Sequence, residues 1–161
     1  MTVGGTDCPI WEPRHPFSKS WCSHKLEGAG LRCEVGICIQ TGDIVWINGP
    51  FRCGHWSDLK IFRQGLKNKL RPGEMVECDG THKGDVGCRN KHVAVNRSDI
   101  RAKNGGRSRH ETINGDIKIF DCLKNHWRHE RSLHKFVFGA SCDLTQIAYN
   151  LNARKPYQVA Y

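Results

Sequence analysis

The sequence predicts an α/β domain in which a mixed β-sheet is flanked by helices, with residues 1–161 forming a single unit. Two observations support this fold class. Apolar and β-branched residues alternate with period two in the first half of the chain, whereas apolar residues recur at helical spacing after residue 108. A length of 161 residues, with 38% hydrophobic and 25% charged residues, suits one domain with a hydrophobic core.

Three strands are predicted before the first helix. Residues 3–10 form a short strand, and residues 31–40 alternate between apolar and other side chains. The tight turn at 41–43 leads into residues 44–47, which are expected to pair back as a β-hairpin and to end at Asn48-Gly49-Pro50.

A helix and a fourth strand follow the hairpin. Ser57 is the predicted N-cap, and Arg71-Pro72-Gly73 ends the helix. The apolar face of this helix consists of Leu59, Phe62, Leu66 and Leu70. Residues 75–78 are expected to form a further, buried strand.

A long loop and two helices make up the remaining half. Residues 80–106 are rich in glycine, asparagine and charge, so we expect a basic functional loop with only a hint of strand at 93–95. Helical spacing of apolar residues then runs from Ser108 to Trp127, and again from Ser132 to about Leu151. The last helix is expected to bury Leu133, Phe136, Val137, Ala140, Leu144, Ile147 and Leu151.

The positive charge of the chain is concentrated in one segment. The net charge is +9, of which residues 83–135 carry +7, with thirteen Lys or Arg against six Asp or Glu. A basic surface of this kind neutralises phosphates and releases counterions, so it favours DNA as a partner. A solvated, soluble surface is the alternative interpretation.

Membrane insertion and a disulfide framework are both unsupported by the sequence. No stretch reaches the roughly 18 apolar residues of a membrane span, and no signal segment follows Met1. Nine cysteines, an odd number scattered through the predicted elements, favour reduced thiols. We therefore expect an intracellular protein.

Three blocks of the sequence are similar to a known family. They are VGGTDCPI at 3–10, GPFRCGHWSDLKIF at 49–62 and RSRHETIN at 107–114. In this order, and with weaker similarity at 11–19 and 156–161, they resemble the catalytic domain of PIF/Harbinger-type DDE transposases, the DDE superfamily endonucleases. The resemblance implies an RNase H-like fold.

The resemblance also implies a metal-dependent site for DNA cleavage and strand transfer. Acids from separate elements would hold two Mg²⁺ or Mn²⁺ ions, which are hard cations that prefer carboxylates. Asp58 and Glu111 match the second aspartate and the glutamate of the family, and Asp79 matches an auxiliary ligand. Taken singly, Asp58 also suits a helix N-terminus, Glu111 an i,i+4 pair with Arg107, and Asp79 a turn.

The first catalytic acid of the family is missing from this chain. The family's opening block reads Val-Asp-Gly-Thr, so its aspartate falls at position 4, where this sequence has Gly4. Asp7 is a candidate replacement, but along a strand positions 4 and 7 point to opposite sides and lie about 10 Å apart. We therefore expect DNA cleavage to be lower by several orders of magnitude.

The resemblance extends to partners and location. It implies a nuclear location and a separate Myb-like DNA-binding protein, and self-association is a further expectation. The basic segment predicts DNA contacts from Arg101, Lys103, Arg107 and Arg109. The upstream helix-turn-helix segment of such transposases is not in this chain, which therefore looks like a truncated or decayed copy, or one retained for binding.

Two functions of other classes compete with this interpretation. Cys78, His82, Cys88 and His92 have the spacing Cys-x3-His-x5-Cys-x3-His, and four such ligands would close a tetrahedral zinc site. The other alternative is a catalytically silent DNA-binding or protein-interaction domain, for which DNA affinity would depend on salt without cleavage.

Overall fold

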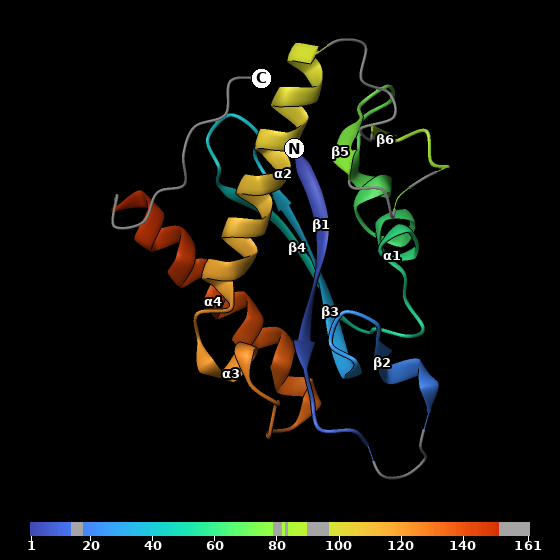
Figure 1. Cartoon of the computed structure of the whole chain (residues 1–161), viewed down its shortest axis with the longest axis vertical. Helices are drawn as coiled ribbons and strands as arrows, with labels where there is room; N and C mark the ends of the chain where they lie inside the picture. The colour runs from blue at the N-terminus through green and yellow to red at the C-terminus, as the bar shows by residue number, and fades with distance from the viewer. Residues whose placement is uncertain (14–17, 79–81, 83, 90–96, 152–161) are drawn as a thin grey trace.

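A mixed β-sheet between helices forms the centre of the chain, in the computed structural model that describes residues 1–13, 18–78, 82, 84–89 and 97–151 (Figure 1). The strands are β1 (Thr2–Pro9), β2 (Cys22–Ser23), β3 (Gly28–Ile37), β4 (Ile44–Arg52), β5 (Val76–Cys78) and β6 (Cys88–Arg89). The helices are α1 (Asp58–Gln64), α2 (Arg97–Ile117), α3 (Asp121–Lys124) and α4 (His134–Asn150), with 3₁₀ turns η1 (Lys19–Trp21), η2 (Leu66–Lys69) and η5 (Arg131–Leu133). The α/β prediction is confirmed.

The sheet changes from antiparallel to parallel at β1. Strands β4, β3 and β1 are antiparallel neighbours, whereas β5 runs parallel to β1 and β6 parallel to β5. The β1–β5 ladder covers only the pairs Thr2–Glu77 and Val3–Cys78. From Gly4 onward, the edge of β1 that faces β5 therefore has no strand partner among the described residues.

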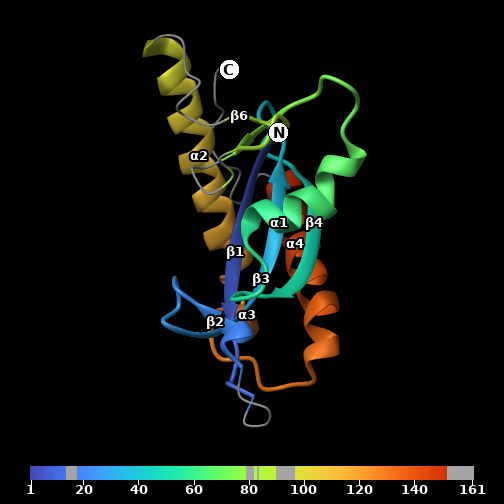
Figure 2. The same ribbon diagram turned by 90° about the vertical axis from the view of Figure 1, so that its right-hand side faces the viewer.

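Side chains of β1 alternate between two hydrophobic cores, one on each face of the sheet. Cys8 points to the face covered by α2, α3 and α4, where it packs in the larger core with Ile113 and Phe138. Val3 points to the opposite face, where it packs with Phe62 of α1. Figure 2 shows α1 and α2 on opposite sides of β1.

Strand β4 continues beyond its predicted end. The chain was expected to leave the strand at Asn48-Gly49-Pro50, but β4 extends to Arg52. Pro50 has no N–H to donate, which is tolerated because β4 pairs with β3 on one side and lies at the edge of the sheet. A register shift between Arg32 and Glu34 on β3 absorbs the irregularity.

The α1 helix begins as predicted but ends early. The Ser57 hydroxyl accepts a hydrogen bond from the Lys60 backbone N–H at 3.3 Å, which confirms the N-cap. Gly65 leaves the helical conformation, and the chain continues as the 3₁₀ turn η2. Leu66 is nevertheless buried in the smaller core, as its place on the apolar face predicted.

The predicted loop over residues 80–106 is wrong in part, because α2 begins at Arg97 and β6 lies at 88–89. Gly106 allows α2 to lie against the sheet, since an added Cβ would be 3.3 Å from Thr2 Cγ2. Sequence reasoning took this glycine as a loop signal, but packing against β1 stabilises the helix here. The strand hint at 93–95 lies outside the described residues.

The predicted helix over 108–127 ends at Ile117 and is followed by the separate short helix α3. Trp127 then returns to the sheet, where its backbone N–H donates to the Pro9 carbonyl at 2.9 Å. None of the helices in the described ranges is long and apolar enough to cross a membrane.

Helix α4 is present, but most of the side chains that it buries differ from those predicted; of the predicted set, Val137 is partly buried against the core. Phe136, Leu144 and Ile147 were expected in the core and are exposed. The buried side chains are instead His134, Phe138, Ser141, Cys142, Thr145 and Tyr149. Two of these side chains form hydrogen bonds inside the protein: the Thr145 hydroxyl donates to the Ser141 carbonyl, and the Tyr149 hydroxyl donates to Asp116 at 2.7 Å.

His134 is the most unusual residue of this buried face. Its ring is completely buried beside Trp127 and Phe138. Neither ring nitrogen has a hydrogen-bond partner within the described part of the chain. Burial lowers the pKa of His134 to about 4, from 6.5.

This buried imidazole makes the fold sensitive to acid. Between pH 6.5 and about 4 the unfolded chain binds a proton at His134 that the folded protein does not bind, so stability decreases as the pH falls through this range. Between pH 7 and pH 4.5 the free energy of unfolding should fall by about 2 kcal/mol less in His134→Phe than in the unsubstituted chain, as measured by urea denaturation. His129→Phe is the control, because His129 contacts the same tryptophan but is exposed. Identical pH dependence in His134→Phe and the unsubstituted chain would contradict the expectation.

Candidate functional site

A cavity of about 530 Å³ lies along the uncovered edge of β1. It is bounded by β1, by the end of β5, by α2 and by the turn between β2 and β3, from which Lys25 and Leu26 contribute. The cavity exists because β5 pairs with only two residues of β1. Gly4 and Gly5 line it where that pairing stops.

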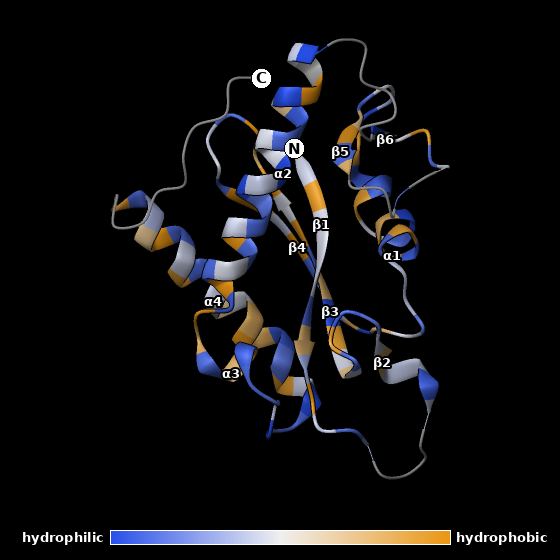
Figure 3. Cartoon of the chain, viewed as in Figure 1, coloured by the Kyte–Doolittle hydropathy of each residue, from blue (hydrophilic) through white to orange (hydrophobic). Residues whose placement is uncertain are grey.

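One face of α2 supplies polar side chains to this cavity. They recur every three or four residues, the spacing of a helix face, and are Lys103, Arg107, His110, Glu111, Asn114 and Lys118. Ile113 and Ile117 point instead into the larger core. Figure 3 shows hydrophilic residues along most of the length of α2.

Gly4 faces this stripe rather than α1. A Cβ built on Gly4 would lie 3.0 Å from Nε2 of His110, whose Nδ1 is 3.0 Å from the Thr2 hydroxyl. A side chain at position 4 would therefore be directed toward α2 and the cavity. It would fit only if the His110 ring moved by a few tenths of an ångström.

Glu111 stands at the rim of the cavity, and most of its side chain is exposed. Arg107 Nε is 3.3 Å from its carboxylate, one turn earlier on the helix. The structure thus contains the i,i+4 pair that was the alternative interpretation of this residue. An exposed pair of this kind contributes well under about 1 kcal/mol, so Glu111 keeps access to solvent at little cost.

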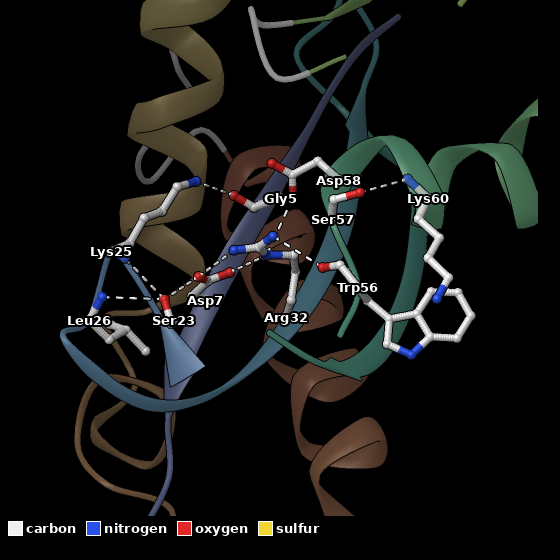
Figure 4. Close-up of polar contacts among 10 residues, drawn as sticks. All are labelled: Gly5, Asp7, Ser23, Lys25, Leu26, Arg32, Trp56, Ser57, Asp58 and Lys60. Atoms are coloured by element: carbon white, nitrogen blue, oxygen red, sulfur yellow. Dashed lines mark hydrogen bonds and ion pairs between the residues drawn. The ribbon is translucent and has the colours of Figure 1, made fainter. Parts of the chain in front are cut away.

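Asp58 lies on the other face of the sheet, buried at the start of α1. A Cβ at Gly5 would overlap the Asp58 carboxylate, so the absence of a side chain at Gly5 is what allows α1 to approach β1 here. Arg32 Nε is 3.3 Å from Asp58 Oδ1 (Figure 4). Because Gly4 and Gly5 point to opposite faces, Asp58 and the polar stripe of α2 are separated by β1.

Asp7, the candidate replacement for the missing aspartate, lines the cavity and is held by the same guanidinium. Arg32 donates to both of its oxygens, at 2.7 and 2.8 Å, and the Ser23 hydroxyl donates at 2.6 Å (Figure 4). Burial by itself would raise the pKa of Asp7, but the hydrogen bonds from Arg32 and Ser23 outweigh it and lower the pKa below 3.8. Asp7 is therefore a charged, structural residue.

The predicted metal ligands are not brought together within the described residues. Asp58 and Asp7 share the guanidinium of Arg32, whereas Glu111 is exposed on the α2 side of the sheet. No group of three or more His, Cys, Asp or Glu side chains in the described ranges is arranged to hold a metal ion. Asp79 lies outside those ranges; it directly follows Cys78 in the sequence. The described acids therefore do not by themselves fit a two-metal site.

Two of the four predicted DNA contacts are buried. Lys103 donates to Glu77 at 3.0 and 3.2 Å, and Arg109 donates to the Cys38 and Ile39 carbonyls at the end of β3. Both side chains hold α2 to the sheet. Arg101 and Arg107 are exposed, so they remain available to a ligand.

Sequence reasoning missed two cations at the cavity. Lys118 lies on the α2 stripe, and the helical spacing from Arg107 would have identified it if it had been used to find ligands as well as core residues. Lys25 comes from the turn before β3, and no local signal in the sequence places it beside α2. Neither lysine forms an ion pair with a carboxylate of the described residues.

Two of the four residues of the zinc-knuckle alternative lie close together. Cys78 and Cys88 lie on neighbouring strands with their sulfur atoms 3.1 Å apart, and His82 is buried against Phe62. His92 lies outside the described residues.

No protein-family model, curated protein or solved structure matches this chain.

The guanidinium of Arg32, which pairs with both Asp7 and Asp58, allows a test of what stabilises the fold. Replacing Arg32 with methionine keeps much of the side-chain volume but leaves two buried carboxylates without their cation, so we expect the free energy of unfolding to fall by about 3–5 kcal/mol. Arg107→Met, at the exposed pair, should change it by less than about 0.5 kcal/mol. Urea denaturation at pH 7 measures both.

Adding Asp7→Asn and Asp58→Asn to Arg32→Met should recover part of the loss, because the buried negative charges are then gone. If Arg32→Met were as stable as Arg107→Met, the ion cluster would not be a main support of the fold.

Proposed function

We propose that this chain is a DNA-binding domain of transposase ancestry, with an RNase H-like fold and impaired metal-dependent cleavage. The order of elements supports the fold assignment: apart from the two-residue strand β2, the chain forms three antiparallel strands, a helix and then parallel strands, with further helices after them. This is the order that the resemblance to DDE transposases implies.

Cations that converge on one cavity carry the DNA-binding proposal. Lys25 and Lys118 reach the cavity from different elements and form no ion pair with a carboxylate among the described residues, and exposed Arg107 also lines the cavity. Arg101 adds a further exposed charge on α2. A phosphate backbone lying along α2 would satisfy these charges and release counterions. Such contacts fix position without reading sequence.

Impaired cleavage is supported by the state of each acid. Position 4 carries no carboxylate, and the Asp58 carboxylate is paired with the guanidinium of Arg32. Glu111 lines the cavity, but the other two acids of the described lining, Asp7 and Glu77, are already paired with Arg32 and Lys103, and no group of three or more potential ligands in the described residues is arranged to hold a Mg²⁺ or Mn²⁺ ion. Two fixed cations are required for in-line displacement, so binding without efficient cleavage is the expected behaviour.

Residual or recoverable nuclease activity is the second candidate. The geometry at Gly4 favours this candidate, because a carboxylate at position 4 would point toward α2 and the cavity. Glu111 lines that cavity, and so does Cys78, the residue before Asp79. A nuclear location, a Myb-like partner and self-association belong to the same proposal and follow from the resemblance alone.

The DNA-binding surface is testable by charge reversal. We expect duplex DNA to bind with little sequence preference, and Arg107→Glu or Lys118→Glu to lower affinity and to reduce the slope of log K against log salt by about 1 per lost phosphate contact. Fluorescence anisotropy at several salt concentrations measures both quantities. Lys69→Glu is the matched control, since Lys69 is an exposed lysine on η2, on the opposite side of the sheet.

Affinity that does not change with salt would remove the phosphate-binding role. Equal weakening by Lys69→Glu would show that total charge, rather than the α2 surface, determines binding.

Cleavage is testable by restoring the missing acid. The unmodified chain should show little nicking of supercoiled DNA with Mg²⁺ or Mn²⁺, and Gly4→Asp should increase nicking by roughly 10-fold or more, because it adds a fixed carboxylate to the cavity. Gly115→Asp is the control: it adds the same charge at the cavity on α2, with no neighbouring atom within 4 Å of the new Cβ.

Glu111→Gln in the Gly4→Asp background should abolish the gained activity. Asp58→Asn and Asp79→Asn in the same background separate a metal-binding role from a structural one, since only a folded but inactive variant indicates a ligand. Strong nicking by the unmodified chain that survives both Glu111→Gln and Asp58→Asn would sink the assignment.

A further inference from the structure

Two cysteines of the sheet are close enough to react with each other. Cys78 ends β5 and Cys88 begins β6, and the ladder pairs Cys88 with Val76, two residues before Cys78 on the same face of β5. The sulfur atoms are 3.1 Å apart. A disulfide bond is about 2.05 Å long, so a movement of roughly 1 Å between β5 and the edge strand β6 would bring the two sulfur atoms to bonding distance.

The surroundings of the two thiols differ. Cys88 is buried in the smaller core with Val76 and Phe62. Cys78 is only half-buried and borders the cavity beside β1. A reagent from solvent therefore reaches the Cys78 thiol before the buried Cys88 thiol. This is the arrangement of an attacking thiol and a resolving thiol.

Other cysteines in the core lack this combination. Burial raises the pKa of Cys8, Cys53 and Cys142 to about 12, which keeps them as inert thiols. Cys122 is exposed on α3, at the far end of α2 from β5 in the view of Figure 1. It therefore serves as a reactive cysteine for comparison.

We infer that Cys78 and Cys88 form a reversible dithiol–disulfide pair that is oxidised by small disulfides such as glutathione disulfide. Cys78 loses its proton to solvent and attacks one sulfur of glutathione disulfide, which forms a mixed disulfide and releases one glutathione thiolate. Cys88 then attacks the Cys78 sulfur, forms the protein disulfide and releases the second glutathione. The protein loses two electrons and two protons, and both appear in the two glutathione thiols.

Oxidation would tie β5 to β6 next to the short β1–β5 ladder. The pair thus connects the redox state of the surroundings to the edge of the cavity. The inference concerns this pair alone and does not require the domain to bind DNA.

The test is thiol mapping of the folded full-length chain. After incubation with glutathione disulfide, tryptic peptide mass spectrometry should show residues 78 and 88 linked, and dithiothreitol should reverse the link. The same treatment in urea should give mixed pairings, since the preference comes from the folded geometry. Cys122→Ser should leave the link unchanged.

Single variants separate the two roles. Cys88→Ser should accumulate a stable glutathione adduct on Cys78, because the resolving thiol is missing, whereas Cys78→Ser should leave Cys88 unmodified. Far-UV circular dichroism checks that both variants fold, and the mapping of the unsubstituted chain needs no variant at all.

Three outcomes would overturn the inference. In the first, both cysteines of the folded chain remain reduced while Cys122 is modified. In the second, Cys78 links to a different cysteine. In the third, the purified protein holds one equivalent of zinc and forms the link only after treatment with a chelator, which would assign the two thiols to a metal site instead.

Discussion

The guanidinium of Arg32 joins parts of the chain that are far apart in sequence. From its place on β3 it binds Asp7 of β1 through two hydrogen bonds, approaches Asp58 of α1 and donates to the Trp56 carbonyl at 3.2 Å (Figure 4). Ser23 of β2 completes the contacts of Asp7. Because both carboxylates are buried, their charges require a cation inside the protein. The register of β1 against β3 and the position of α1 both depend on this arrangement.

The same cluster limits what the domain can do chemically. A carboxylate that already neutralises a buried arginine is a poor ligand for an added metal ion, because binding the metal would leave the guanidinium without a partner in a region of low dielectric constant. Asp58, the acid most clearly matched by the family resemblance, is in this position. Structural and catalytic uses of one residue therefore compete in this fold, and the described geometry favours the structural use.

Glycines determine where the open part of the domain lies. Gly5 makes room for Asp58 on one face of β1, and Gly106 lets α2 approach Thr2 on the other. Because Gly4 has no side chain, the His110 ring lies against β1 at the position where the family has a carboxylate. The cavity, its basic lining and the Cys78–Cys88 pair all lie where the short β5 leaves β1 uncovered.

Local signals in the sequence determined the strands β1 and β3, the Ser57 cap and the existence of α1 and α4. Alternation and capping depend on residues within a few positions of one another, so they can be recognised without the fold. The pairing of Glu111 with Arg107 was predicted in the same way, because helical spacing places them one turn apart. The acidic residues of interest came from the family resemblance, which orders residues along the chain and does not place their charges in space.

Only the tertiary structure decided how those residues are used. Helix α2 begins at Arg97 because packing of Gly106 on β1 outweighs its weak intrinsic preference for helix. Helix α4 buries the side on which Phe138 and Cys142 pack into the larger core and on which Tyr149 donates to Asp116. The pairing of Arg32 with Asp7 and Asp58, and the placing of Lys25 opposite α2, depend on strand register and on contacts between distant segments. Such contacts are set by the whole packed arrangement, and no local pattern of residues specifies them.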